Sequence, residues 1–165
     1  MIPVLLVAAA AAGAAGPVSN ASNAGAAAFT RLKTLAGEWE ADTKMGKAHL
    51  TLDIIGGGSA LVERETAGDM PPMMTVYYLD GTRLLLTHYC MAGNQPRMQA
   101  RQSDAATGSV KFEFLDATNL ASAGAGHMHN ATIKLGDNNH FSTEWEFYEN
   151  GERKMVETAQ YRRVR

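Results

Sequence analysis

From residue 38 onward, apolar and polar residues alternate along the chain, which is typical of β-strands that bury one face. Val110 and Phe112, for example, alternate with Lys111 and Glu113. No stretch between these segments has the length and the periodicity of a helix, so the strands are expected to be antiparallel. The segments with the alternating pattern are 38–45, 47–55, 59–67, 72–79, 82–91, 96–102, 109–115, 127–135, 139–148 and 153–163.

Short stretches rich in glycine, asparagine and aspartate separate these segments, and such residues favour hairpin turns. Asp80-Gly81 and Asn150-Gly151 are two of them. A flat meander of about ten strands would leave two unpaired edges, which closure into a barrel removes. The pattern therefore predicts an all-β fold, a single antiparallel up-and-down barrel of about ten strands.

A short helix is expected before the first strand. Phe29, Leu32 and Leu35 have the spacing of one helix face, and Gly37 is a suitable residue to end the helix. Most segments have a clear inward phase, but 59–67 allows two. Either Arg64 points inward with Val62, or Glu63 and Glu65 do so with Leu61.

Residues 1–28 carry no charged side chain and include an apolar run too short to span a membrane. They resemble a secretory signal peptide, with small-residue cleavage sites at Ala14-Ala15-Gly16 and Ala26-Ala27-Ala28. We expect 1–28 to be a signal peptide or an Ala-rich leader and 29–165 to be the barrel domain. The expected location is periplasmic or secreted, with no membrane insertion after cleavage.

Charge and cysteine content narrow the range of partners. The net charge is −2 and the basic residues are scattered, so no groove for nucleic acid is expected. The only cysteine, Cys90, excludes an internal disulfide, and the chain is expected to be a monomer or a homodimer.

Two pairs of nitrogen- and sulfur-bearing residues are the most informative chemical feature of the sequence. His88 and Cys90 are two residues apart in one expected strand, and His127 and His129 are two apart in another. Residues with this spacing point to the same side of a strand. The end of the fifth strand and the start of the eighth lie at the same mouth of a meander barrel. We therefore expect all four side chains to face one enclosed space.

The opening of the first strand adds a resemblance. Gly37-Glu38-Trp39, preceded by a short helix, resembles the G-x-W motif of lipocalins and other calycins, and residues 86–98 resemble uncharacterised exported bacterial lipocalin-like domains. Ten strands match the fatty-acid-binding-protein and nitrobindin-like branches. This resemblance implies an internal cavity for a small, mostly apolar ligand. Nitrobindin-like proteins hold haem through a late histidine, but no histidine follows His140, so that role is not transferred to any residue.

The leading functional hypothesis is non-catalytic binding of a small, largely apolar molecule in the lumen, with no cofactor. Inward acids are expected to be few, with Glu157 the clearest. The residues expected to contact the ligand are His88, Cys90, Asn94, Gln95, Arg97, His127, His129 and Trp145.

Two alternatives use the same residues. His88, Cys90, His127 and His129 offer N and S donors suited to zinc, copper or haem. A hydrolase or isomerase with His88 or His127 as general base is the third hypothesis. The sequence contains no G-x-S-x-G, H-E-x-x-H or phosphate-loop motif in support of it.

Overall fold

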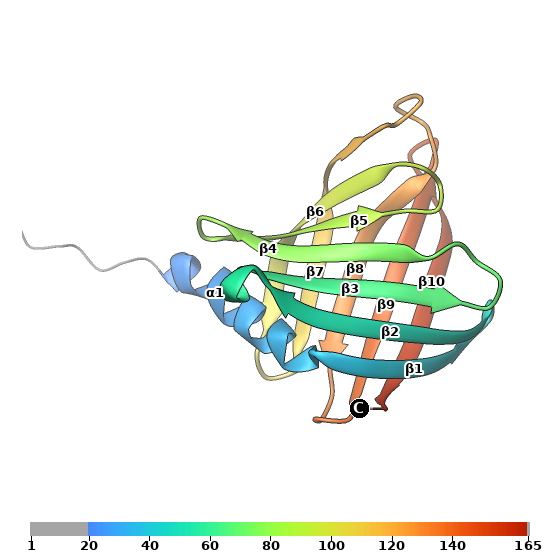
Figure 1. The fold of residues 1–165 in the computed structure, drawn as a ribbon. Coiled ribbons are helices and arrows are strands. Elements are labelled where there is room, and N and C mark those ends of the chain that lie inside the picture. The colour runs from blue at the N-terminus through green and yellow to red at the C-terminus, as the bar shows by residue number, and fades with distance from the viewer. Residues whose placement is uncertain (1–19, 165) are drawn as a thin grey trace, which may run out of the picture.

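The computed structural model describes residues 20–164. Ten antiparallel strands form a closed barrel in which each strand pairs with its neighbours in sequence and β1 pairs with β10 (Figure 1). The predicted fold class and strand number are therefore confirmed. The strands are β1 Gly37–Thr43, β2 Gly46–Ile55, β3 Ala60–Ala67, β4 Met73–Asp80, β5 Arg83–Tyr89, β6 Gln95–Asp104, β7 Ser109–Thr118, β8 His127–Leu135, β9 His140–Glu149 and β10 Glu152–Arg163.

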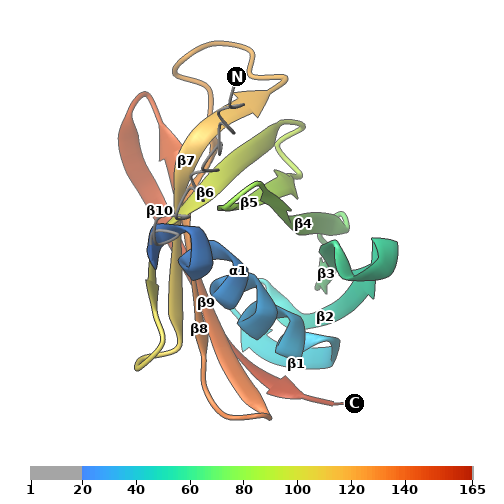
Figure 2. The same cartoon turned by 90° about the vertical axis from the view of Figure 1, so that its left-hand side faces the viewer.

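One end of the barrel is covered by helix α1 (Asn20–Leu32), followed by a single 3-10 turn, Lys33–Leu35. The helix contacts β4, β5 and β6, and Figure 2 shows it lying across the barrel end. Phe29, Leu32 and Leu35 are all buried, as their spacing predicts. The indole N–H of Trp39 donates a 2.7 Å hydrogen bond to the carbonyl oxygen of Leu35. This bond fixes the helix to the start of the first strand.

The helix begins earlier than the sequence predicts, and it includes the end of the predicted leader. Residues 1–19 lie outside the described residues, whereas 20–28 belong to α1. Ala28 is fully buried, and a β-carbon on Gly25 would lie 2.3 Å from the backbone oxygen of Thr82. The end of the leader sequence is thus packed against the barrel. Within residues 20–164, no helix has the length and apolar character needed to cross a membrane.

Most inward faces follow the predicted alternation, with two corrections. The alternation of 47–55 predicts that Ile54 points inward with Leu50 and Leu52, but Ile54 is 47% exposed because it lies at the end of β2, before the turn to β3. In β3 the second phase is the real one: Glu63 is buried, while Arg64 is exposed and binds Asp53 at 2.7 Å. The result is that carboxyl groups, and no arginine, point from β3 into the barrel.

Candidate functional site

His88 lies deep in the barrel wall, at the mouth end of β5. Its side chain is 3% exposed, which confirms the predicted inward orientation. Thr75 lies directly opposite on β4, and its hydroxyl is 3.0 Å from His88 Nδ1. The imidazole also packs against Trp145, with 4.9 Å between ring centroids. His88 Nε2 has no hydrogen-bond partner, although it is buried.

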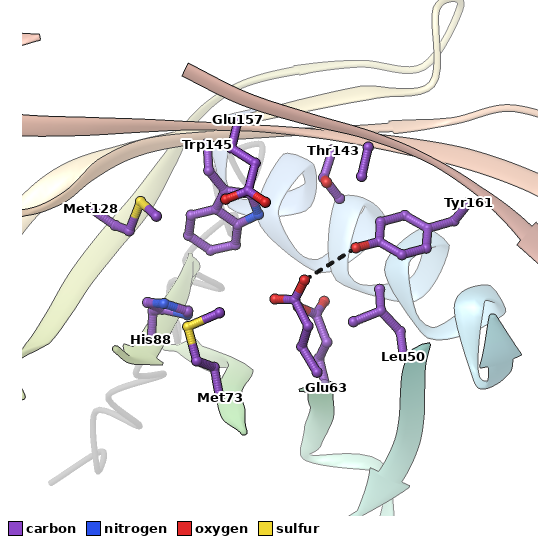
Figure 3. A pocket seen from close by; sticks show the side chains of 11 residues that line it. Leu50, Glu63, Met73, His88, Met128, Thr143, Trp145, Glu157 and Tyr161 are labelled. Carbon is purple, nitrogen blue, oxygen red and sulfur yellow. Dashed lines mark hydrogen bonds between the residues drawn. The ribbon is translucent and has the colours of Figure 1, made fainter. Parts of the chain in front are cut away.

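A small cavity lies beside His88 inside the barrel (Figure 3). Its free volume is about 20 Å³, which is room for about one water molecule. Residues of β2–β5 form one wall and residues of β8–β10 form the other. The eleven lining residues are Leu50, Glu63, Glu65, Met73, His88, Met128, Thr143, Trp145, Glu157, Ala159 and Tyr161.

Three carboxyl groups reach this cavity. Glu63 and Glu65 come from β3, and Glu157 comes from β10 on the opposite wall, as Figure 3 shows for Glu63 and Glu157. Tyr77 donates a 2.9 Å hydrogen bond to Glu63, and Tyr161 donates a 3.4 Å hydrogen bond to Glu65. The centre of the barrel is therefore acidic.

Burial sets the protonation of these carboxyl groups. It raises the pKa of Glu63 from 4.5 to about 8, with a further increase from the charge of Glu65. Burial and the charge of Glu157 raise the pKa of Glu65 to about 7, and burial also raises the pKa of Glu157. The hydrogen bonds from Tyr77 and Tyr161 oppose these increases. Near neutral pH the cluster therefore carries less charge than three free carboxylates would.

Thr75 links His88 to this acidic cluster. Its hydroxyl lies 3.0 Å from His88 Nδ1, and Thr75 also lowers the pKa of Glu63. Burial lowers the pKa of His88 to about 4, so the imidazole is neutral near neutral pH. A neutral imidazole has one N–H and one bare nitrogen. In the tautomer whose Nδ1–H donates to the Thr75 hydroxyl, Nε2 is a bare acceptor.

Only His88 and Trp145 of the eight predicted ligand contacts line this cavity. Cys90 lies just beyond β5 and is half-buried beside the core, and burial raises the pKa of its thiol. Asn94 is buried and donates to the carbonyl oxygen of Gly126 at 2.8 Å, which ties the β5–β6 turn to the loop before β8.

Two more predicted residues at this end are engaged with β7. Gln95 accepts a 2.7 Å hydrogen bond from the Thr118 hydroxyl. Arg97 makes a two-pronged ion pair with Asp116, and its Nε lies 2.6 Å from Asp116 Oδ1. Both side chains thus brace the strand pair β6–β7 beside the mouth.

His127 and His129 lie at the same barrel end as His88, as predicted, but they form a separate cluster. Their rings share a 3.0 Å contact between His127 Nε2 and His129 Nδ1. His129 stacks between Phe114 and Tyr148, at centroid distances of 4.7 and 4.3 Å. Burial and the neighbouring His127 lower the pKa of His129.

A β-bulge explains why these two imidazoles do not line the cavity. The register of β8 against β9 shifts between Met128 and Asn130, which breaks the alternation on which the sequence prediction rests. Met128 belongs to the buried core and lines the cavity in place of its two neighbours. Within residues 20–164, no group of three or more His, Cys, Asp or Glu side chains has the geometry to hold a metal ion. The predicted set of four metal ligands is therefore not assembled.

The sequence prediction missed Glu63, Glu65 and the two tyrosines that hydrogen-bond with them. A signal for the acids was present, because Leu61, Glu63 and Glu65 share one phase of β3. Tyr77 and Tyr161 also alternate in phase with buried neighbours, Thr75 and Ala159. Glu157 is the clearest expected inward acid, and the inward orientation of Glu63 and Glu65 is one of the two phases that the sequence leaves open for segment 59–67.

Comparison with known proteins supports the fold. No protein-family model matches the chain, and no curated protein matches it. The crystal structure of Rv2717c from M. tuberculosis is similar, with a TM-score of 0.58 and 15% identity over 84% of this chain and 98% of that one. A protein of unknown function from the DUF3598 family of Nostoc punctiforme PCC 73102 has a TM-score of 0.54 and 13% identity, over 81% of this chain and 49% of that one. In fold, the chain is thus similar to both of these proteins.

Proposed function

We propose that this protein binds a small organic molecule in the barrel lumen, without catalysis. One observation carries the proposal: His88 lines a cavity, and its Nε2 is buried with no hydrogen-bond partner. A buried polar atom left unpaired costs about 1–3 kcal/mol, which a ligand hydrogen bond would recover. A barrel interior closed at one end by a helix is a common position for such a site.

The cavity walls favour an amphipathic molecule. Apolar side chains and carboxyl groups line the same space. The free volume holds only a compact polar group, so the apolar part of a ligand must displace side chains. Met73 and Met128 line the cavity, and methionine readily changes conformation to fill or vacate space. The charge-free segment 1–28 supports the further proposal that binding takes place outside the cytoplasm.

Native mass spectrometry of the protein purified from its own host tests this proposal. We expect an organic mass bound to the wild type and reduced occupancy in His88→Ala. His140→Ala is the matched control, because His140 is an exposed histidine at the opposite barrel end, and it should retain full occupancy. Wild-type protein with no organic cargo, or with equal occupancy in both variants, would contradict the proposal. A metal mass alone would favour the metal hypothesis instead.

A further inference from the structure

The cavity is lined by three acidic side chains but by no cationic one. None of its eleven lining residues within the described chain is Lys or Arg. Arg64, between two of the acids in sequence, is exposed and binds Asp53 outside the barrel. Three carboxyl groups thus share a small enclosed space with no protein cation facing them. Buried acids in this arrangement are costly unless they are protonated or meet a positive charge.

His88 gives a second and independent indication of a ligand. Nε2 is unpaired, and it is a bare acceptor in the tautomer whose Nδ1–H donates to the Thr75 hydroxyl. Carboxylates are acceptors only. With the acids ionised, the cavity therefore presents acceptors from both walls, and the partner that they lack is a group with several N–H donors.

The size and walls of the cavity fit the same group. The free volume of about 20 Å³ suits a group about the size of a water molecule, as an ammonium is. The Trp145 ring lines the space, and an indole face attracts a cation. Met73 and Met128 are the movable side chains that a short apolar tail would displace.

We propose that the lumen binds an organic amine, with the cationic group held by Glu63, Glu65 and Glu157 and by His88 Nε2. This inference rests on the proposed lumen-binding function and names its ligand class. An anionic head, such as that of a fatty acid, would face three acids without a counter-charge. A neutral alcohol could satisfy His88 but would bring no positive charge to the three carboxyl groups.

Three probes of equal chain length test the ligand class: hexylammonium chloride, hexanol and sodium hexanoate. Their affinities for wild-type protein at neutral pH are measured by isothermal titration calorimetry, which requires no variant to fold. We expect hexylammonium to bind at least about tenfold more tightly than hexanol, and hexanoate to bind most weakly. Equal affinities, or a preference for hexanoate, would overturn the cation assignment. So would hexylammonium that does not bind at millimolar concentration.

Carboxamide variants locate the cation. Glu65→Gln/Glu157→Gln should weaken hexylammonium at least about tenfold and leave hexanol unchanged. The control is Glu149→Gln, because Glu149 is exposed at the end of β9 and does not line the cavity. Equal weakening of hexylammonium and hexanol would indicate damage to the cavity rather than loss of charge recognition, and would contradict the proposal.

These experiments distinguish failure of the amine proposal from failure of the lumen-binding proposal. Native mass spectrometry that finds an organic cargo without a basic nitrogen would refute the amine assignment and keep lumen binding. Protein without any organic cargo, together with no binding of all three probes, would refute both. Zinc chloride serves as an additional probe, and tighter binding of zinc than of hexylammonium would assign the acids to a metal.

Discussion

Glutamine in place of Glu63 should remove a large part of the stability that the barrel loses as pH rises. Glu63 is 4% exposed, and burial raises its pKa to about 8 from the 4.5 expected in the unfolded chain. The folded state therefore holds a proton that the unfolded state releases between these two values. The stability that this proton contributes is fully present below about pH 4.5 and is lost as pH rises to about 8.

The expected magnitude follows from the same two values. Each pH unit between 4.5 and 8 corresponds to about 1.4 kcal/mol, so the wild type should lose about 5 kcal/mol from Glu63 alone. This is a large part of the roughly 5–15 kcal/mol that stabilises a typical domain. Glutamine has nearly the same shape and can still accept the hydrogen bond from Tyr77, but it cannot ionise. Any cost of the new amide is independent of pH.

The measurement is the free energy of unfolding in urea, taken at about pH 5 and about pH 9. The difference between these two values should be several kcal/mol smaller for Glu63→Gln than for the wild type. Glu149→Gln, the exposed control on β9, should retain the wild-type difference. If Glu63→Gln also retained it, Glu63 would not be a buried, protonated acid, and the electrostatic description of the lumen would be wrong.

Two further substitutions test how stability changes at acidic pH and how α1 packs against the barrel. Since burial lowers the pKa of His88 from 6.5 to about 4, stability should fall by about 3 kcal/mol as pH drops through that interval, and His88→Gln should reduce this fall in the same urea assay. Gly25→Ala should lower the thermal midpoint despite its higher helix propensity, because the new β-carbon would lie 2.3 Å from the backbone oxygen of Thr82. Ala27→Ser, at an exposed position of α1, is the control, and an equal loss in both variants would contradict the packing argument.

The sequence predicts the barrel well because its strands are antiparallel and bury one face. Val110 and Phe112 are fully buried, while Lys111 between them lies outside. The residue pattern of such a strand therefore indicates which of its faces points inward. Turn residues such as Asn150 and Gly151 adopt positive φ, and this local preference places the hairpins. Both signals are short-range, and the topology then follows from closure.

The site is harder to predict because it depends on strand register and on which of two similar faces of a strand points inward. The bulge beside His129 adds one residue to β8 but leaves the alternation visible in the sequence unchanged. The alternation therefore predicts that His129 lies in the lumen beside His88, whereas His129 does not line the cavity in the structure. In β3 both faces carry an apolar residue and charged residues, and the choice is made by partners on other strands. Asp53 on β2 binds Arg64 outside, and Tyr77 on β4 binds Glu63 inside.

The lumen is built at the expense of stability, and this cost is the strongest indication that it has a function. Leucine in place of Glu63 or Glu65 would avoid the desolvation of an acid, and replacement of a buried ionisable group by a well-packed apolar one often stabilises a protein. His88 Nε2 adds an unpaired acceptor to the same space. Features that reduce stability while converging on one cavity are typical of binding sites, where side chains are arranged for a partner rather than for the fold. A cation between the two walls would pair these groups at once, since it supplies several N–H donors and the positive charge that none of the eleven lining residues brings as Lys or Arg.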